Sequence, residues 1–138
     1  MSGKTTIGKI VAEKLHFTFC DTDELIGEKN NISIGEIIEQ YGEECFREYE
    51  QELIRDYVST DSHVISIGGG AVNMKTKEMI KRYRYRVWLK CPIKRLVGRY
   101  EPNKQERPLL YNTNNIKREL EASLIERMPF YSECANIV

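Results

Sequence analysis

The sequence has no excess of charge of either sign, no long apolar run and no apolar stretch of the kind found in a secretory leader at its amino terminus. Its 138 residues carry 21 Lys+Arg and 21 Asp+Glu, so the formal net charge is zero. A balanced charge lacks the basic footprint of non-specific nucleic-acid binding. No apolar run approaches the roughly 20 residues of a membrane-spanning helix, and residues 1–6 lack the apolar stretch of a secretory signal. We therefore expect a cytoplasmic protein with neither a nucleic-acid nor a membrane partner.

The sequence also lacks the residue clusters that bind zinc. The four cysteines lie far apart without a C-x-x-C pair, and the two histidines belong to no metal-binding spacing. A zinc site is therefore not expected. In a chain without a leader, we expect four reduced thiols that are mostly buried.

The hydrophobic pattern predicts a single domain over residues 1–138. Apolar runs at 64–67 and 87–89 indicate buried parallel strands, and weaker runs at 17–20 and 135–138 are further candidates. Helical patterns lie at 4–15, where the apolar residues form a stripe on one face, and at 33–41, 43–59, 77–84, 93–100 and 115–127, with Gly42 and Pro129 expected as breaks. Ser33, with Glu36 three residues later, predicts a capping box at the start of the second helix. Strands that alternate with helices predict a three-layer α/β/α fold around a parallel sheet.

Gly3-Lys4-Thr5-Thr6 before an amphipathic helix matches the second half of a P-loop, G-x-x-x-x-G-K-[ST]. In such a loop the backbone N–H groups and the lysine bind phosphates, and the hydroxyl after the lysine binds Mg²⁺. The first glycine and its strand would precede Met1, so we expect the chain to be clipped at its N-terminus. An ordinary helix start is the alternative explanation of the triplet alone.

Two carboxylates, Asp21 and Asp23, follow the apolar run at 17–20. The carboxyl ends of strands are where open α/β sheets bind ligands. One carboxylate could support Mg²⁺ through water, and the other could accept a proton from an attacking hydroxyl. Helix N-capping by Asp23 is the simpler alternative.

Three further patterns could bind an anionic substrate. Arg47 and Glu50 lie one helical turn apart, which suits either an exposed ion pair or a rigid fork for a carboxylate. Gly68-Gly69-Gly70 follows a buried strand, which indicates close approach of a ligand to the backbone more than a flexible turn. Arg107 lies in a long polar loop and Arg127 near a helix end, where either could be merely solvated or interact with the helix dipole.

Six motifs, in this order and spacing, resemble the shikimate kinase family. They are Gly3-Lys4-Thr5-Thr6-Ile7-Gly8, Asp21-Thr22-Asp23, Phe46-Arg47-x-x-Glu50, Gly68-Gly69-Gly70-Ala71-Val72, Arg107-Pro108-Leu109-Leu110 and Arg127-x-Pro129-x-Tyr131. The resemblance implies a P-loop kinase fold with five parallel strands and a mobile lid, here without the first strand and the terminal helix. It implies that ATP, with Mg²⁺, phosphorylates the 3-hydroxyl of shikimate on the route to chorismate and the aromatic amino acids. A monomer is expected.

The resemblance also implies a role for individual residues. Lys4, Asp23 and Arg107 would be catalytic, with Asp23 as the base. Shikimate would contact Asp23, Arg47, Gly69, Gly70 and Arg127. The nucleotide would contact Gly3, Lys4, Thr5, Thr6, Arg99 and Arg107, and Mg²⁺ would contact Thr5 directly and Asp21 through water. The substrate-binding segment would span 21–59 and the lid 101–115. A gluconate-kinase-like enzyme and a non-catalytic nucleotide-binding relative remain alternatives.

Overall fold

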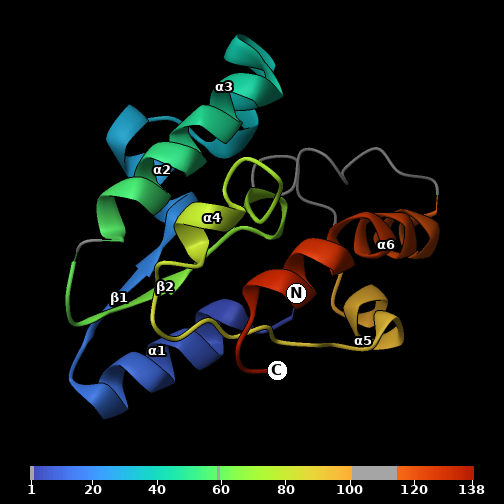
Figure 1. Cartoon of the computed structure of the whole chain (residues 1–138). Coiled ribbons are helices and arrows are strands. Elements are labelled where there is room, and N and C mark those ends of the chain that lie inside the picture. Colours follow the sequence, from blue (N-terminus) through green and yellow to red (C-terminus); the bar gives the residue numbers. More distant parts are fainter. Residues whose placement is uncertain (1, 59, 101–114) are drawn as a thin grey trace.

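The computed structural model describes residues 2–58, 60–100 and 115–138 (Figure 1). Arg107 and all but the last residue of the predicted lid lie outside the described residues. Along the chain the elements are α1 (Lys4–Leu15), β1 (Thr18–Asp21), α2 (Thr22–Asn30), α3 (Ile34–Tyr57), β2 (His63–Ser66), the 3₁₀ turn η1 (Gly69–Ala71), α4 (Lys77–Ile80), α5 (Ile93–Gly98) and α6 (Ile116–Cys134).

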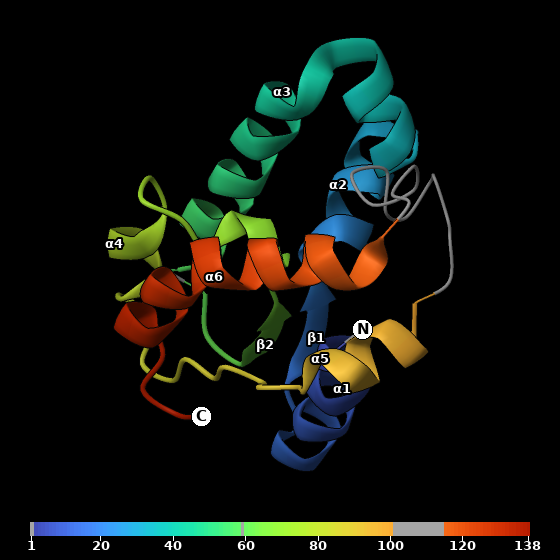
Figure 2. The same cartoon turned by 90° about the vertical axis from the view of Figure 1, so that its right-hand side faces the viewer.

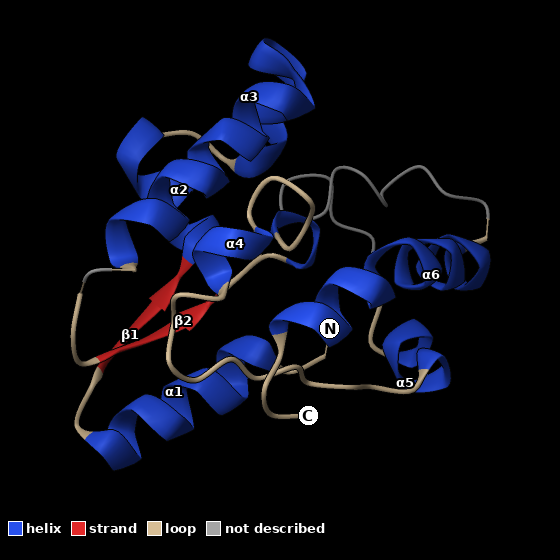
Figure 3. Ribbon diagram, in the orientation of Figure 1, coloured by secondary structure: helices blue, strands red, loops and turns tan. Residues whose placement is uncertain are grey.

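Strands β1 and β2 form a parallel pair, in register from Thr18 opposite His63 to Asp21 opposite Ser66. Successive side chains of a strand point to opposite faces. The Phe19 ring packs against Gly8 of α1, whereas Cys20 contacts Tyr57 of α3. Helices therefore cover both faces of the pair, which is the predicted layered α/β arrangement (Figure 3).

The predicted strands at 87–89 and 135–138 do not form a ladder. They meet at one parallel bridge between Val87 and Ile137, where the Trp88 N–H donates to the Ile137 carbonyl at 2.9 Å. A groove separates them from β2, so the described residues give neither segment a second strand to pair with. Apolar side chains line this groove, including Ile7, Val11, Ile65, Val87 and Leu89.

The predicted apolar stripe of α1 faces this groove rather than a closed core. Ile7, Val11 and Leu15 line the groove, with 43%, 38% and 51% of their surface exposed, and Ala12 is the buried residue of the helix. The helix bounds match the prediction, but the periodicity did not reveal what the stripe would face.

Helix α3 begins with the predicted capping box. The Glu36 N–H donates to the Ser33 hydroxyl at 3.2 Å, and the Ser33 N–H donates to the Glu36 carboxylate at 2.8 Å. Gly42 adopts φ 86° and ψ 162°, which kinks the helix where a break was predicted. A left-handed φ of this kind favours glycine because it has no side chain.

Helix α6 continues through Pro129 to Cys134, so the prediction that Pro129 ends the helix is wrong. Proline removes one backbone hydrogen bond, but tertiary contacts hold the following turn. Cys134 is buried in a cluster with Ile54 of α3 and Ile80 of α4, and the Tyr131 hydroxyl is hydrogen bonded to the Gly69 carbonyl. Helices α4 and α5 are shorter than the predicted 77–84 and 93–100.

Two hydrophobic clusters organise the described residues. The first joins α2 to α3 through Ile26, Ile37, Phe46 and Leu53, and the second joins α3, η1, α4 and α6. Figure 2 shows α6 running between the α2–α3 pair above and α1 with α5 below. The four cysteines are free thiols, as predicted, although two of them are only partly buried. Among the described helices, none combines the length and the hydropathy that a membrane span requires.

Candidate functional site

The amino-terminal end of α1 has the form expected of a phosphate-binding turn. Gly3 is the N-cap, with a left-handed φ of 95°, and its carbonyl accepts from the Ile7 N–H at 2.9 Å. Lys4 is the first helical residue, and its side chain lines the cavity that includes the groove beside β2. The free N–H groups of a helix start and its dipole both favour an anion.

Three oxygen-bearing side chains lie where the start of α1 meets the carboxyl ends of the strands: Thr5 of α1, Asp21 at the end of β1 and Ser66 at the end of β2. The Thr5 hydroxyl donates to Oδ2 of Asp21 at 3.1 Å, and Asp21 pairs in register with Ser66 of β2. Ser66 is 6% exposed, and its buried hydroxyl has no hydrogen-bond partner among the described residues. A hydroxyl, a carboxylate and an unsatisfied buried oxygen are the hard ligands that Mg²⁺ and its water shell prefer.

Asp21, and not Asp23, caps helix α2. The Asp21 side chain accepts from the Asp23 N–H at 3.1 Å, so the capping alternative for Asp23 is wrong. The exposed Asp23 side chain lines the cavity instead, where a methyl group added to Gly68 would lie 3.3 Å from its Oδ1 atom. Asp23 therefore lies beside the glycine turn and faces the cavity.

Each of the three consecutive glycines packs against a different polar side chain. A methyl group at Gly68 would lie 2.6 Å from Oε1 of Glu50, and one at Gly69 would lie 2.9 Å from the Tyr131 hydroxyl. At Gly70 it would lie 2.6 Å from Nη2 of Arg47. The close approach predicted from the sequence is thus made, in this structure, by side chains of the chain itself. A ligand contact at Gly69 and Gly70 stays a prediction.

The Arg47 guanidinium is held between two carboxylates of α3. Its Nη1 donates to Oε2 of Glu50 at 2.5 Å, and its Nη2 donates to Oε1 of Glu43 at 2.8 Å. Burial disfavours the charged guanidinium, but the two carboxylates more than compensate, so the pKa of Arg47 is raised. The predicted Arg47–Glu50 pair is therefore a partly buried ion pair rather than a solvated one.

Glu50 is a buried acid, with only 1% of its surface exposed. Desolvation raises the pKa of Glu50 to about 7, against the opposing effect of Arg47, while Asp23 raises it further and Arg127 lowers it. The carboxyl group therefore changes protonation near neutral pH in the folded protein.

Arg127 approaches the same glycine turn from α6. A methyl group at Gly69 would lie 3.5 Å from its Nη1 atom. Tyr131, one turn later, donates its hydroxyl hydrogen to the Gly69 carbonyl at 2.7 Å, and its ring lies 5.4 Å from that of Trp88. Arg47 and Arg127 thus reach neighbouring glycines from two different helices.

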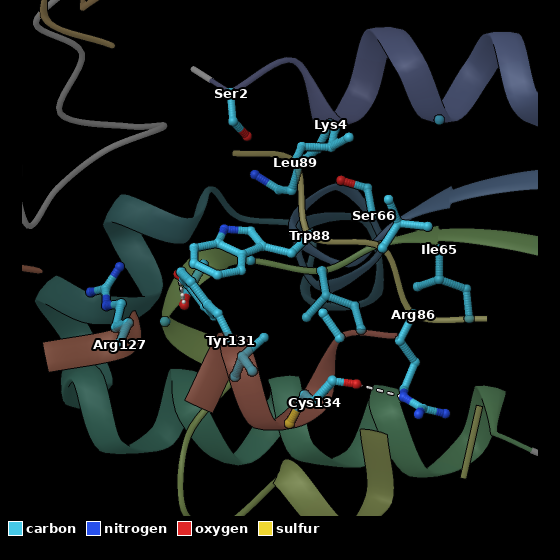
Figure 4. Close-up of a pocket in the computed structure, with 18 of the residues that line it drawn as sticks. Ser2, Lys4, Ile65, Ser66, Arg86, Trp88, Leu89, Arg127, Tyr131 and Cys134 are labelled. Carbon is cyan, nitrogen blue, oxygen red and sulfur yellow. Dashed lines mark hydrogen bonds between the residues drawn. The ribbon is translucent and has the colours of Figure 1, made fainter. Parts of the chain in front are cut away.

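One cavity, which includes the groove beside β2, brings together six of the twelve predicted site residues and also Glu50. It has a volume of about 1560 Å³, and its lining includes Lys4, Asp23, Arg47, Glu50, Gly69, Gly70 and Arg127. This volume exceeds that of a typical single-ligand site. Figure 4 shows Lys4 and Ser66 on one side of Trp88, with Arg127 and Tyr131 on the other.

Four predicted nucleotide residues, Gly3, Thr5, Thr6 and Arg99, do not line this cavity, and neither does the predicted metal ligand Asp21. Thr6 is exposed on α1, and Arg99 is exposed at the carboxyl end of α5. The described residues contain no group of three or more His, Cys, Asp or Glu side chains that could hold a metal ion. This finding does not test Mg²⁺ binding by Thr5 and Asp21.

The sequence interpretation gave no role to Ser66, Glu43 or Tyr131. Ser66 is the one polar residue in the run Val64–Ile67, and this could have marked it. Glu43 lies four residues before Arg47 in the predicted helix at 43–59, so the helical spacing already placed it beside that arginine. Tyr131 lies four residues after Arg127, but the expected break at Pro129 hid this relation, because α6 in fact continues to Cys134.

We predict that Glu50 makes stability depend on pH in an unusual direction. The pKa of Glu50 is about 7 in the folded protein against an ordinary value of 4.5. Between pH 4.5 and 7 the folded protein therefore keeps Glu50 protonated, whereas the unfolded protein loses that proton. The resulting stabilisation of the folded state is fully present below pH 4.5 and is lost as the pH rises through 7. Relative to Glu50→Gln, the unfolding free energy of the wild type should fall by about 3 kcal/mol between pH 4.5 and 8.

Urea unfolding across this pH range measures the difference. Glu43→Gln is the matched control, because it removes an exposed carboxylate from the same arginine. Parallel pH profiles for the wild type and Glu50→Gln would contradict the assignment.

Known proteins resemble this chain in both sequence and fold. A sequence model of the family described as shikimate kinase matches residues 1–138. A shikimate kinase of a Sulfurihydrogenibium species is 43% identical over 110 residues, which cover 79% of this chain and 66% of that protein. The shikimate kinase of Mesorhizobium japonicum is 38% identical over 132 residues, with coverages of 95% and 64%. The chain thus spans about two thirds of the length of these relatives.

Solved structures agree with the sequence comparison. A shikimate kinase from Acinetobacter baumannii, in complex with shikimate, superposes with a TM-score of 0.92 at 34% identity, covering 99% of this chain and 75% of that one. A shikimate kinase from Aquifex aeolicus gives a TM-score of 0.82 at 31% identity, with coverages of 99% and 79%. Since the family match extends over every residue and the fold agrees, this chain belongs to the shikimate kinase family.

Proposed function

We propose that the protein transfers the γ-phosphate of ATP to the 3-hydroxyl of shikimate. The observation that carries this proposal is the meeting of Arg47 and Arg127 at the Gly69–Gly70 turn, in the cavity that Lys4 also lines. Two guanidinium groups suit a planar carboxylate, and a lysine at a helix start suits a phosphate. The site therefore offers separate anchors for a ring acid and for a nucleotide.

Family membership supports shikimate as the acid. The Acinetobacter baumannii relative, which shares the fold over 99% of this chain, is a structure with shikimate bound. The residues of this chain fit that ligand chemically, since arginines suit its carboxylate and an aspartate suits its hydroxyl groups.

In this proposal the nucleotide phosphates lie at the start of α1. Lys4 and the first N–H groups of the helix would hold the β- and γ-phosphates, and Gly3 permits close approach of the backbone. Thr6 and Arg99 would contact the nucleotide outside the cavity. Arg107, which lies outside the described residues, would cover the phosphates.

Thr5, Asp21 and Ser66 would hold Mg²⁺, directly or through its water shell. Their oxygens fit this ion, as the unsatisfied Ser66 hydroxyl indicates. When bound, Mg²⁺ neutralises charge on the phosphate oxygens. The Thr5–Asp21 hydrogen bond keeps both oxygens directed to the same place.

Asp23 would act as the general base. Its carboxylate lies beside Gly68, where a hydroxyl of an acid bound at Gly69 and Gly70 could reach it. As the hydroxyl oxygen bonds to the γ-phosphorus, the bond from phosphorus to the bridging oxygen of ADP breaks and Asp23 takes the hydroxyl proton. The products are ADP and shikimate 3-phosphate.

We further propose that a monomer performs this reaction in the cytoplasm. The arginines, the lysine and the aspartates of the site all come from a single chain, and ATP is available in that compartment.

The direct test is ADP release by the purified protein in the presence of ATP and Mg²⁺. We expect release to depend on shikimate, with gluconate giving less than about a tenth of the rate, because a flexible acid pays more entropy to bind. Release without dependence on shikimate would contradict the proposal, and a preference for gluconate would favour the alternative kinase. Shikimate binding without turnover would indicate a non-catalytic relative.

Replacing one glycine should change the KM for shikimate and leave the KM for ATP nearly unchanged. In Gly70→Ala the new methyl group would lie 2.6–2.8 Å from three atoms of the Arg47 guanidinium, so the guanidinium must move. We expect the KM for shikimate to rise about tenfold or more, which corresponds to about 1.4 kcal/mol, while the KM for ATP stays within about twofold.

Gly98→Ala is the matched control, since a methyl group there meets nothing within 4 Å. An unchanged KM for shikimate in Gly70→Ala, or an equal rise for both substrates, would remove Arg47 from the acid-binding role.

A further inference from the structure

Tyr131 connects Arg127 of α6 to the glycine turn on which Arg47 packs. It lies on α6 one turn after Arg127, so that both side chains occupy the same face of the helix. Its hydroxyl donates to the carbonyl of Gly69 at 2.7 Å across a sequence separation of 62 residues. This bond ties the last helix of the chain to the glycine turn that follows β2.

The same hydroxyl also contacts Arg127. A phenol has one hydrogen to donate, and its oxygen can still accept. Because that hydrogen is directed to Gly69, the oxygen is left to accept from the Arg127 guanidinium. Burial raises the pKa of Tyr131, while the Arg127 charge and hydrogen bond oppose the rise. The phenol oxygen is thus a bridge between Arg127 and the backbone of Gly69.

Through the backbone, the bridge extends to the second arginine. Gly70 follows Gly69 directly, and the Arg47 guanidinium packs on it so closely that a methyl group would lie 2.6 Å from Nη2. A shift of the Gly69 carbonyl would therefore move the surface on which Arg47 rests. The tilted contact between the Tyr131 and Trp88 rings, 5.4 Å between centroids, fixes the other side of the phenol.

We propose that Tyr131 is a positioning residue that sets the separation of Arg47 and Arg127 through the Gly69 carbonyl. With this separation fixed, a planar carboxylate can bind both guanidinium groups without first ordering them. The inference rests on the proposed function, in which shikimate supplies that carboxylate. Tyr131 itself need not touch the substrate.

Tyr131→Phe removes the hydroxyl and keeps the ring. The KM for shikimate should rise about tenfold, because the carboxylate would then have to order the two guanidinium groups on binding, while the KM for ATP should stay within about twofold. Trp88 is the single tryptophan of the chain and lies against Tyr131. Its fluorescence therefore gives the shikimate dissociation constant independently of turnover, and that constant should rise by the same factor.

The chain offers a closely matched control in Tyr83→Phe. The Tyr83 hydroxyl also donates to a backbone carbonyl at 2.7 Å, but its acceptor is Ile54 of α3 rather than the glycine turn. Burial raises the pKa of Tyr83 to about 12, so both phenols are desolvated. Both variants should lower the thermal midpoint, but Tyr83→Phe should leave the KM for shikimate within about twofold.

The outcomes separate this inference from the function on which it rests. A wild type that neither binds nor phosphorylates shikimate would overturn the proposed function and the inference with it. An active wild type with an unchanged KM in Tyr131→Phe would overturn the inference alone. Equal rises in Tyr131→Phe and Tyr83→Phe would also overturn it, because they would indicate a general loss of stability.

Discussion

The candidate site depends on three consecutive glycines, because polar side chains can pack directly against the backbone only where the backbone carries no side chain of its own. Gly68, Gly69 and Gly70 bring Glu50, Tyr131 and Arg47 respectively to within contact of the main chain. These side chains come from α3 and α6, which are far apart in sequence, so the turn joins two helices as well as exposing backbone groups. Any larger residue in the turn would push the charged groups apart.

The electrostatics of the site follow from this packing. Glu50 is desolvated because it packs against the glycine turn. This desolvation raises the pKa of Glu50, and the Arg47 charge only partly opposes the rise. Arg47 in turn keeps its charge through Glu50 and Glu43. Because the desolvation of two ions offsets their attraction, we expect this buried pair to orient the guanidinium more than to add net stability.

Local signals in the sequence predicted the local structure well. The bounds of α1, the capping box at Ser33 and the kink at Gly42 each depend on a few neighbouring residues, and each is present. The glycine turn and the Arg47–Glu50 pair also follow from short patterns. The prediction that Pro129 ends α6 was wrong because contacts of Tyr131 and Cys134 with residues distant in sequence hold the helical turn after it. The single bridge at Val87, the cap at Asp21 and the pKa of Glu50 likewise depend on tertiary packing, which short patterns do not contain.

The most direct measurement of the central claim compares the binding of shikimate with that of its methyl ester by calorimetry. The two ligands share the ring and the hydroxyl groups, but only shikimate carries the negative charge that Arg47 and Arg127 would bind. We expect the ester to bind about 100-fold more weakly, or by about 2.7 kcal/mol, because two charge-assisted contacts are lost. Affinities equal within about twofold would contradict the account, because they would show that the paired arginines do not bind a carboxylate.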